Sequence, residues 1–577
     1  MAWAASGGSP VPGRAAPDPA GERDPGAAPP RSDAADGPGD ARGSEGHSQT
    51  APGPGPSVEQ RGLFPLLLVA FLLVIAAWSF ATPLMASPDE PSQVKQATAL
   101  VRGQIDEPHV PGKFGPVSNI RVPEWAARAA LLPQCFAFRP QRSGFCPVVV
   151  GGSRRMVTAQ TQFSNYPPLY FAWVGLPSLP LTGRSALYAM RLTSALANAS
   201  LLALGVYLLA RYHPRRFPLV GALVALTPMV LFLSGVVNAS GLEITAAFAS
   251  WCAGLCVIES REIPRTLAVW TSLAFAVFIL SRPISPVNAA AVLVVLAALA
   301  GWRRLRTLTA TPRALPIGGI ILGAGVVAGI SLVVGGSPSL LGRPLHPALT
   351  FSGAFHEVWT LDPSRLEQGI GLFGWTDTPI PHPVQLLWIG LAAGLCLIGL
   401  LRSTRFLLAL VLLVVAILAM PVIFEIPKIN AIGPYWQGRY WLPLLVGIPL
   451  TATAASGHRP IRRLQGLLDT PLAAGARVAA AVLLGAVIVW AQVAAFVLAL
   501  HRYTTGLDRP AGTPIQWMPP GGITFVVVTF VLGELLLAGA IAWMVVRPQR
   551  ARPSRPGRSR PPAHKHSRRS GRLAAHT

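Results

Sequence analysis

The chain has 577 residues, of which 51% are hydrophobic and only 12% are charged, and its mean hydropathy is +0.47. A soluble protein of this length would carry roughly twice that density of charge, so the composition excludes an ordinary soluble domain. The formal net charge is +24. Its basic residues gather in short segments between apolar blocks and in an acid-free tail. This distribution indicates membrane topology and anionic lipid headgroups, and no nucleic-acid partner is expected.

The N-terminal region, residues 1–60, is rich in Pro, Gly, Ala, Ser and Asp and has few large apolar side chains. Such a segment cannot bury enough surface to offset its ordering entropy, so we expect a disordered cytoplasmic tail. The first apolar block, 63–81, lies too deep in the chain for a cleavable signal peptide. We therefore expect it to be a retained membrane span.

Further apolar blocks follow, most with a length close to the ~17–25 residues that cross a bilayer. They are 187–210, 218–234, 242–258, 267–281, 287–301, 317–335, 384–401, 406–423, 441–456, 478–500 and 522–546. These blocks predict an all-α, polytopic transmembrane bundle of about 12 spans within residues 61–546. Arginine is concentrated in every second loop, which places both termini, and with them the basic disordered tail 547–577, in the cytoplasm of a plasma-membrane protein.

Two segments on the opposite side are long, 82–186 and 336–383. The first has frequent Pro, Gly and Asn among aromatic residues, so we expect a large, ordered extracytoplasmic loop. Cys135 and Cys146 lie in it with ten residues between them, where an oxidising compartment would permit a disulfide. Two free thiols are the alternative.

The most specific motif is Ser87-Pro88-Asp89-Glu90-Pro91, directly after the first span. Two adjacent carboxylates at a membrane surface suit a general base or a ligand for a divalent metal ion. The structural alternative is a helix start, with an acidic N-terminus and Pro91 at an early helical position. The two interpretations are compatible.

Two further outer motifs combine aromatic rings with turns. Tyr166 lies in Asn-Tyr-Pro-Pro-Leu-Tyr before the second span, and Trp375 and Asp377 lie in Phe-Gly-Trp-Thr-Asp-Thr-Pro of the second long loop. An aromatic ring beside a carboxylate is typical of carbohydrate contact. Interfacial anchoring is the alternative for the rings.

A fourth motif is Tyr-Trp-Gln-Gly-Arg-Tyr, which contains Trp436, Gln437 and Arg439. An arginine beside amphipathic rings can bind a phosphate, and a snorkelling interfacial arginine is the alternative. Arg282 and Glu243 are ionisable residues at or in apolar blocks, where a functional role is expected by default.

Metal and nucleotide motifs are absent from the sequence. His346, His356 and His382 share the second long loop, but their spacing matches no metal motif, and no phosphate-binding glycine loop or nucleophile elbow is present.

These four motifs, in this order, resemble those of a DUF2142-like family of bacterial predicted integral membrane proteins, which is related to the GT-C superfamily of membrane glycosyltransferases. The resemblance covers roughly residues 63–500. It implies a GT-C-like fold, a polyprenyl-phosphate sugar donor, and an acidic pair, here Asp89 and Glu90, that deprotonates the acceptor or holds a metal. Arg439 would then meet the lipid phosphate. The chain departs from the pattern at Gln93, where family members often carry a histidine.

The resulting hypothesis is a glycosyltransferase that moves a sugar from the lipid donor to an extracytoplasmic glycan or lipid acceptor of the cell envelope. The substrate contacts would come from Tyr166, Arg282, Trp375, Asp377 and the segment 436–439. The alternatives are a transporter or flippase of a lipid-linked saccharide and a non-catalytic scaffold. The charged motifs lie at the outer surface and no internal repeat is visible, which favours the enzyme.

Overall fold

The computed structural model describes residues 62–105, 109–112, 115–334, 348–360, 365–455, 471–510 and 512–546. The tails predicted to be disordered, 1–60 and 547–577, lie outside the described residues. So do His346 and residues 456–470, which make up most of the cytoplasmic loop predicted between the apolar blocks 441–456 and 478–500.

Eight helices in the described ranges are long and apolar enough to cross a membrane. They are α2 (Leu63–Ala81), α6 (Gly183–Tyr212), α9 (Ala239–Glu259), α13 (Ala314–Val334), α16 (His382–Arg402), α17 (Thr404–Phe424), α22 (Pro471–Thr504) and α23 (Gly522–Val546). Each coincides with an apolar block of the sequence. The prediction of a polytopic helical bundle is therefore confirmed.

The four remaining apolar blocks are helical too, but they form shorter or broken helices. These are α7 (Pro218–Ala225), α8 (Pro228–Ser234), α10 (Arg265–Ile279), α11 (Ser285–Ala300), α19 (Leu442–Leu445) and α20 (Gly447–Ala455). Proline explains the break before α8, because Pro228 has no N–H and holds Thr227 extended, with ψ of 159°. Among the described residues, eight helices are long and apolar enough to span a membrane. The number is nine if α11 and the helix that follows it after a sharp bend count as one span. The total of 12 stays a prediction.

An aromatic cluster around Trp78, near the C-terminal end of α2, packs several segments of the bundle together. The ring of Trp78, on α2, lies 4.9 Å from Phe373 and 4.9 Å from Phe496 on α22. It also lies 5.5 Å from Phe232 on α8 and 6.1 Å from Phe530 on α23. Edge and tilted contacts of this kind add to the burial of apolar area. The cluster therefore joins five segments that are separate in the sequence.

The segment between α2 and α6 is ordered, as expected, but it contains strands as well as helices. Its elements are α3 (Glu90–Leu100), β1 (His109–Gly112), β2 (Gly115–Pro123), α4 (Glu124–Ala129), η1 (Leu132–Cys135), β3 (Met156–Thr161), α5 (Pro168–Gly175) and η2 (Leu176–Ser178). The strands form an antiparallel sheet in the order β1-β2-β3, with Ser118 opposite Thr161 and Pro123 opposite Met156. Buried Ile120 and Val122 alternate with exposed Arg121 on β2. The sheet thus has one packed face, the alternation typical of antiparallel sheets.

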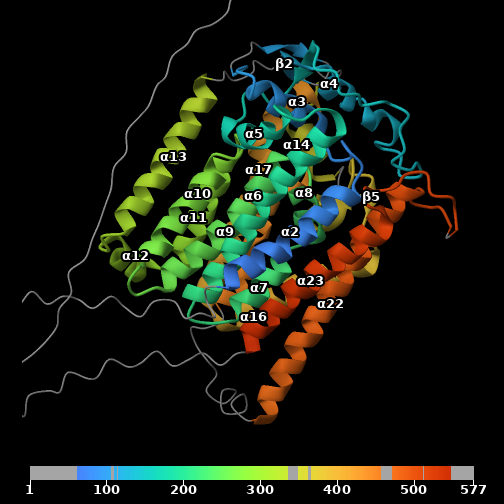
Figure 1. Cartoon of the computed structure of the whole chain (residues 1–577). Coiled ribbons are helices and arrows are strands. Elements are labelled where there is room, and N and C mark those ends of the chain that lie inside the picture. The colour runs from blue at the N-terminus through green and yellow to red at the C-terminus, as the bar shows by residue number, and fades with distance from the viewer. Residues whose placement is uncertain are drawn as a thin grey trace, which may run out of the picture. The chain divides into compact units, whose positions relative to one another are not determined.

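The later outer segments are short. They comprise α14 (Phe351–Thr360), α15 (Arg365–Gly371), the paired strands β4 (Leu372–Phe373) and β5 (Thr378–Pro379), α18 (Ile426–Ile432) and η3 (Gly438–Tyr440). The helix α12 (Trp302–Thr309) follows α11. In Figure 1, α3, α4 and β2 lie at one end of the helix bundle and α12 lies at the other.

Candidate active site

The acidic pair lies where α3 begins, just after the end of α2. Asp89 is the N-cap residue of α3, and Pro91 occupies an early helical position. The sequence motif therefore does mark a helix start. However, Asp89 has a left-handed backbone, with φ of 67°, and its carboxylate makes no capping hydrogen bond. The helix start accounts for the position of Asp89 and leaves its side chain available for other contacts.

Glu90 turns inward and is fully engaged by a buried arginine. Its Oε1 accepts a hydrogen bond from Nε of Arg191 at 2.7 Å, and its Oε2 accepts one from Nη2 at 2.7 Å. Oε1 also accepts the backbone N–H of Val237 at 3.2 Å. The side chain of Glu90 is 2% exposed and that of Arg191 is 0% exposed. Both oxygens of Glu90 are thus used inside the protein.

Arg191 extends this pair to the end of the first span. It donates to the carbonyl oxygens of Ser79 at 2.9 Å, Thr82 at 2.6 Å and Pro83 at 2.8 Å. The last carbonyls of a helix have no partner within the helix, so the guanidinium satisfies them. Arg191 was not identified as a functional residue from the sequence. The signal was a lone charge inside the apolar block 187–210, which is costly unless it is paired.

Asp89 turns the other way, toward Arg439. Its Oδ2 accepts a close hydrogen bond from Nη2 of Arg439, and its Oδ1 accepts one from Nε2 of Gln162 at 3.4 Å. The side chain of Asp89 is 24% exposed, whereas that of Arg439 is 2% exposed. The two predicted residues are therefore in direct contact, across 350 positions of sequence. Asp89 is the acid of the pair that a ligand can reach.

Arg439 is held in place by the short helix η3. The backbone N–H of Gly438 donates to Oε1 of Gln368 at 2.7 Å. A side chain at Gly438 would meet the carbonyl oxygen of Arg365 at 1.9 Å, so glycine is required there. Upstream, Oε1 of Glu425 accepts the N–H of Tyr435 at 2.7 Å and that of Trp436 at 2.8 Å. These contacts fix the backbone on both sides of the Arg439 guanidinium.

A second buried arginine, Arg282, lies near the first. Its guanidinium carbon is 4.7 Å from the ring centre of Tyr440 and 5.9 Å from that of Tyr166. The guanidinium carbon of Arg439 is 5.2 Å from the same Tyr440 ring. Arg282 is paired with Glu243 on α9 at 2.8 Å. The sequence motifs around Asp89, Tyr166, Arg282 and Arg439 thus converge on one cluster.

The two tyrosines of this cluster give it an aromatic wall. Burial raises the pKa of Tyr166, and the Arg282 guanidinium partly opposes that shift. The phenol therefore stays protonated at neutral pH and can donate a hydrogen bond. Tyr440 accepts a hydrogen bond from Nη2 of Arg439 at 3.4 Å. Tyr440 belongs to the sequence motif that contains Arg439, but no role was predicted for it.

Three polar atoms of residues 436–439 are buried without a hydrogen-bond partner among the described residues. They are Nε1 of Trp436, Oε1 of Gln437 and Nε of Arg439. A buried polar group left unpaired costs about 1–3 kcal/mol. These four residues thus offer two unpaired hydrogen-bond donors and one unpaired acceptor, beside the partly exposed carboxylate of Asp89. A few polar groups that converge in this way are typical of a ligand-binding site.

Gln93 occupies the position where family members often carry a histidine. Its Oε1 accepts the backbone N–H of Ala239 at 2.7 Å, and its Nε2 donates to Oδ1 of Asn238 at 3.4 Å. Asn238 in turn donates to the carbonyl of Pro88 at 3.0 Å. Gln93 therefore ties α3 to the start of α9, directly behind Asp89.

The acidic pair does not fit a divalent metal ion. Both oxygens of Glu90 bond to Arg191, while Asp89 faces Arg439, so the two carboxylates diverge. No group of three or more His, Cys, Asp and Glu side chains that could hold a metal occurs in the described part of the chain. In this arrangement an arginine bonds to each carboxylate, Arg191 to Glu90 and Arg439 to Asp89, so the geometry does not favour the predicted role of the pair in holding a metal ion.

Trp375 and Asp377 of the second outer loop lie beside the acidic motif but face protein. Nε1 of Trp375 donates to the carbonyl of Met85 at 3.1 Å. Oδ2 of Asp377 pairs with Arg502 on α22 at 3.0 Å, and the side chain of Asp377 is 6% exposed. Asp377 is thus a buried ion-pair partner, not a carboxylate presented beside an aromatic platform. Arg502, the other member of the pair, was not singled out from the sequence.

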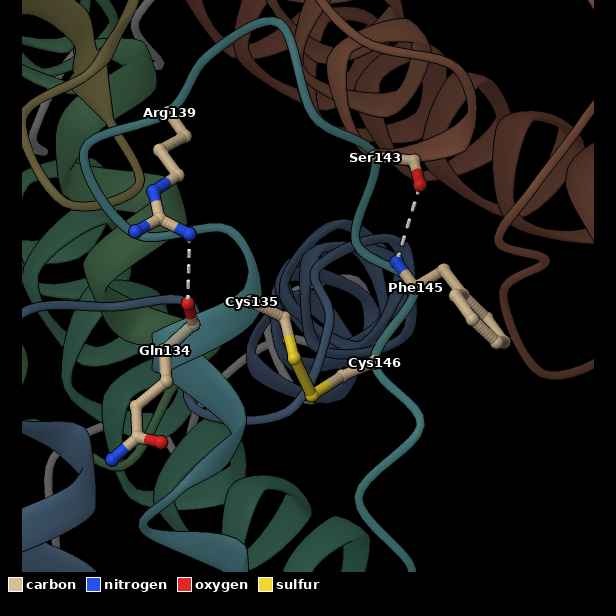
Figure 2. The surroundings of a disulfide bond; sticks show 6 residues. All are labelled: Gln134, Cys135, Arg139, Ser143, Phe145 and Cys146. Atoms are coloured by element: carbon tan, nitrogen blue, oxygen red, sulfur yellow. Dashed lines mark hydrogen bonds between the residues drawn. A yellow bond between two sulfur atoms is a disulfide. The ribbon is translucent and has the colours of Figure 1, made fainter.

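The two cysteines of the first outer loop are joined by a disulfide, with Cα atoms 5.5 Å apart. Figure 2 shows the bridge closing the loop 135–146, with Arg139 donating to the carbonyl of Gln134 and Ser143 accepting the N–H of Phe145. Arg502 also donates to the carbonyl of Phe136 at 2.9 Å. The bridged loop therefore packs directly on the Asp377–Arg502 pair.

Comparison with known proteins places the chain in a family. No curated protein matches it significantly. Two solved structures of ArnT from Cupriavidus metallidurans, one in the apo state and one bound to undecaprenyl phosphate, align over 85% of this chain. The alignments cover 78% of the apo chain and 77% of the bound chain, with 15% and 14% identity and TM-scores of 0.38 and 0.37. Similarity at this level carries neither substrate nor residues over to this chain.

The family described as "Predicted membrane protein (DUF2142)" matches residues 72–448, which include every motif of the site. The match spans more than half of the chain and begins within the first membrane helix, α2. The chain belongs to the DUF2142 family of membrane proteins.

Proposed function

We propose that this protein is a membrane glycosyltransferase that moves a sugar from a polyprenyl-phosphate donor to an acceptor on the outer side of the membrane. The observation that carries the proposal is the Asp89–Arg439 contact. A partly exposed carboxylate touches a buried guanidinium whose Nε has no partner in the described protein. The resemblance of the motifs to those of GT-C enzymes supports the same reaction.

Arg439 is suited to the phosphate of the donor. An arginine binds phosphate best through two parallel N–H donors, and the edge formed by Nε and Nη2 provides such a pair. Nε is unpartnered, and Nη2 bonds to Asp89. An arriving phosphate would therefore replace Asp89 on this edge. Arg282, which also contacts the Tyr440 ring, would add positive charge near the same phosphate.

Release from Arg439 leaves the Asp89 carboxylate free to act as a general base. It accepts the proton of an acceptor hydroxyl as the oxygen attacks the anomeric carbon of the donor sugar. The bond between that carbon and the phosphate oxygen breaks, and polyprenyl phosphate leaves with the electron pair. Arg439 stabilises the negative charge that develops on the leaving phosphate. No metal takes part in this scheme.

The other residues divide into contact and positioning roles. Tyr166, Trp436 and Gln437 are assigned to contacts with the sugar, because Trp436 and Gln437 carry unpartnered polar atoms and the Tyr166 ring lies beside Arg282 in the same cluster. Glu90 and Asp377 are assigned to positioning, since each is buried in an ion pair with an arginine. Trp375 is also a positioning residue through its bond to the backbone at Met85, three residues before Pro88.

The test is lipid binding by the purified full-length protein, followed by native mass spectrometry. The ligands are a polyprenyl phosphate and the matching polyprenol without phosphate. Charge-assisted hydrogen bonds contribute about 1.5–3 kcal/mol, so Arg439→Gln should weaken binding of the phosphate by about 10- to 100-fold. Binding of the polyprenol should be the same in both proteins.

Arg128→Gln is the matched control, because Arg128 lies on α4 in the same outer segment and its side chain is 53% exposed. Unchanged affinity of Arg439→Gln for the polyprenyl phosphate, or equal loss in Arg128→Gln, would contradict the assignment. A protein that binds the phosphate through Arg439 but forms no product would favour the transporter or scaffold alternatives.

A further inference from the structure

The end of the bundle opposite the candidate active site carries a helix that runs across the others. The chain bends by 110° between α11 and α12, at Gly301, which has a φ of 73°. Trp302 is 67% exposed at the start of α12, and Leu308 is buried at its end. Arg303 and Arg306 are also exposed. A short helix with basic residues and an exposed tryptophan is typical of the membrane–water interface.

The length of α9 places this helix on the other side of the membrane from Asp89. The start of α9 is tied to the acidic motif by the bond from Asn238 to the carbonyl of Pro88. Its far end, at Glu259, lies about 30 Å away, because an α-helix rises 1.5 Å per residue. Arg304 of α12 donates to the carbonyl of Ile258 at 2.9 Å. The α12 region and the candidate active site therefore occupy opposite membrane surfaces.

A basic cavity of about 280 Å³ opens beside α12. Three arginines line it, Arg261, Arg304 and Arg405, against one carboxylate, Glu259. The rest of its wall includes Leu299 and Ala300. A second cavity, of about 450 Å³, adjoins it and shares Arg261 and Glu259. The first cavity thus has an excess of positive charge together with apolar contact surface.

Two of these arginines are fixed in position by backbone carbonyls at helix ends. Arg304 bonds to Ile258, the last but one residue of α9, and Arg405 donates through Nη1 to the carbonyl of Ala300 at 2.9 Å. A side chain at Gly301 would lie 2.9 Å from the guanidinium carbon of Arg405, so the bend and the arginine fit together. Each guanidinium has five N–H donors and keeps further donors for an anion. The site is therefore pre-organised.

We propose that this cavity binds the phosphate headgroup of an anionic glycerophospholipid from the leaflet on the α12 side. Charge complementarity identifies the occupant: several guanidinium groups at the depth of the headgroups attract anionic lipids. The apolar wall, which includes Leu299 and Ala300, suits the glycerol and upper acyl region of a lipid, and a free phosphate ion has no apolar part that could use it. The site is separate from the proposed donor site and does not depend on it.

The test uses the purified full-length protein titrated with phosphatidylglycerol, with phosphatidylcholine or with inorganic phosphate, followed by native mass spectrometry. Arg261 lines both cavities and its side chain is exposed, so Arg261→Gln should fold normally. Each basic residue near an anionic membrane surface contributes about 1 kcal/mol to binding, so the loss of one arginine should weaken the affinity for phosphatidylglycerol about fivefold. The double variant Arg261→Gln, Arg405→Gln should therefore bind this lipid about 30-fold more weakly.

Arg265→Gln is the matched control, because Arg265 is exposed at the start of α10, three residues past the cavity-lining Glu262. We expect the protein to bind phosphatidylglycerol tightly and phosphatidylcholine weakly. The affinity of Arg265→Gln for phosphatidylglycerol should equal that of the wild type. Equal affinity for both lipids, equal losses in Arg261→Gln and Arg265→Gln, or full displacement by inorganic phosphate would overturn it. The basic tail 547–577 is present in every variant, so any lipid binding by the tail contributes equally to all the affinities that are compared.

Discussion

Glu90→Gln removes one charge from the buried pair with Arg191 and leaves the shape of the side chain almost unchanged. Arg191 would keep its bonds to the carbonyls of Ser79, Thr82 and Pro83. It would lose the bidentate carboxylate, in which both contacts measure 2.7 Å. The amide of glutamine would accept one bond and turn its NH₂ group toward the guanidinium. The result is a buried cation without a counter-charge.

The expected cost is large, because breaking a buried ion pair by removing one partner costs about 3–5 kcal/mol. In a protein of this size, each kcal/mol of lost stability lowers the midpoint of thermal unfolding by about 2 °C. The midpoint of the variant in detergent should therefore fall by about 5–10 °C. The assay is the temperature at which the purified protein aggregates or loses its near-ultraviolet signal. The double variant Glu90→Gln, Arg191→Met should recover part of the loss, since it removes the unpaired charge as well.

Glu124→Gln is the control, because Glu124 pairs with exposed arginines on α4 and the following segment, where screening makes ion pairs weak. It should leave the midpoint unchanged. A Glu90→Gln protein as stable as the wild type would refute the positioning role and return Glu90 to the candidates for catalysis.

Two further predictions concern the disulfide and the membrane topology. Cys135 and Cys146 should appear as one linked peptide in mass mapping without reduction, and two freely alkylated thiols would rule out the bridge. The distribution of arginine between the loops predicts that both termini and the loop between the apolar blocks 441–456 and 478–500 are cytoplasmic. On a cysteine-free background, a cysteine at Phe138, which is 69% exposed, should react with an impermeant reagent in intact cells. One at Gln465 should react only after permeabilisation, and its labelling in intact cells would reverse the topology.

The helices could be predicted from the sequence because an apolar block long enough to cross a membrane can satisfy its backbone hydrogen bonds there only as a helix or as part of a closed barrel. All twelve blocks are helical, from 63–81 to 522–546. The number of crossings could not be derived in the same way. Pro228 divides the block 218–234 into two short helices, and the prolines of the 280–286 region lie between the short helices α10 and α11; whether such helices form one span depends on their neighbours.

The candidate site was only partly predictable. Asp89, Tyr166, Arg282 and Arg439 each stand in a distinctive motif, and the structure brings all four together. The different positions of Asp89 and Glu90 could not be foreseen, because a single left-handed residue at the start of α3 turns adjacent side chains to opposite sides. Their partners, Arg439 and Arg191, lie 350 and 101 positions away, and no local spacing links residues at such distances.

The most direct test of the account is the product formed by Asp89→Asn. Asparagine can still accept the bond from Arg439, so the variant should reach the membrane in normal amounts, which immunoblotting checks. A strain of the source organism that lacks the protein is complemented with wild type or Asp89→Asn, and its lipid-linked sugars and surface glycans are profiled. Loss of a general base predicts that product falls by about 10²–10⁴-fold while the lipid-linked donor accumulates. Product at near wild-type levels, with equal amounts of protein, would contradict the assignment of Asp89 as the catalytic base.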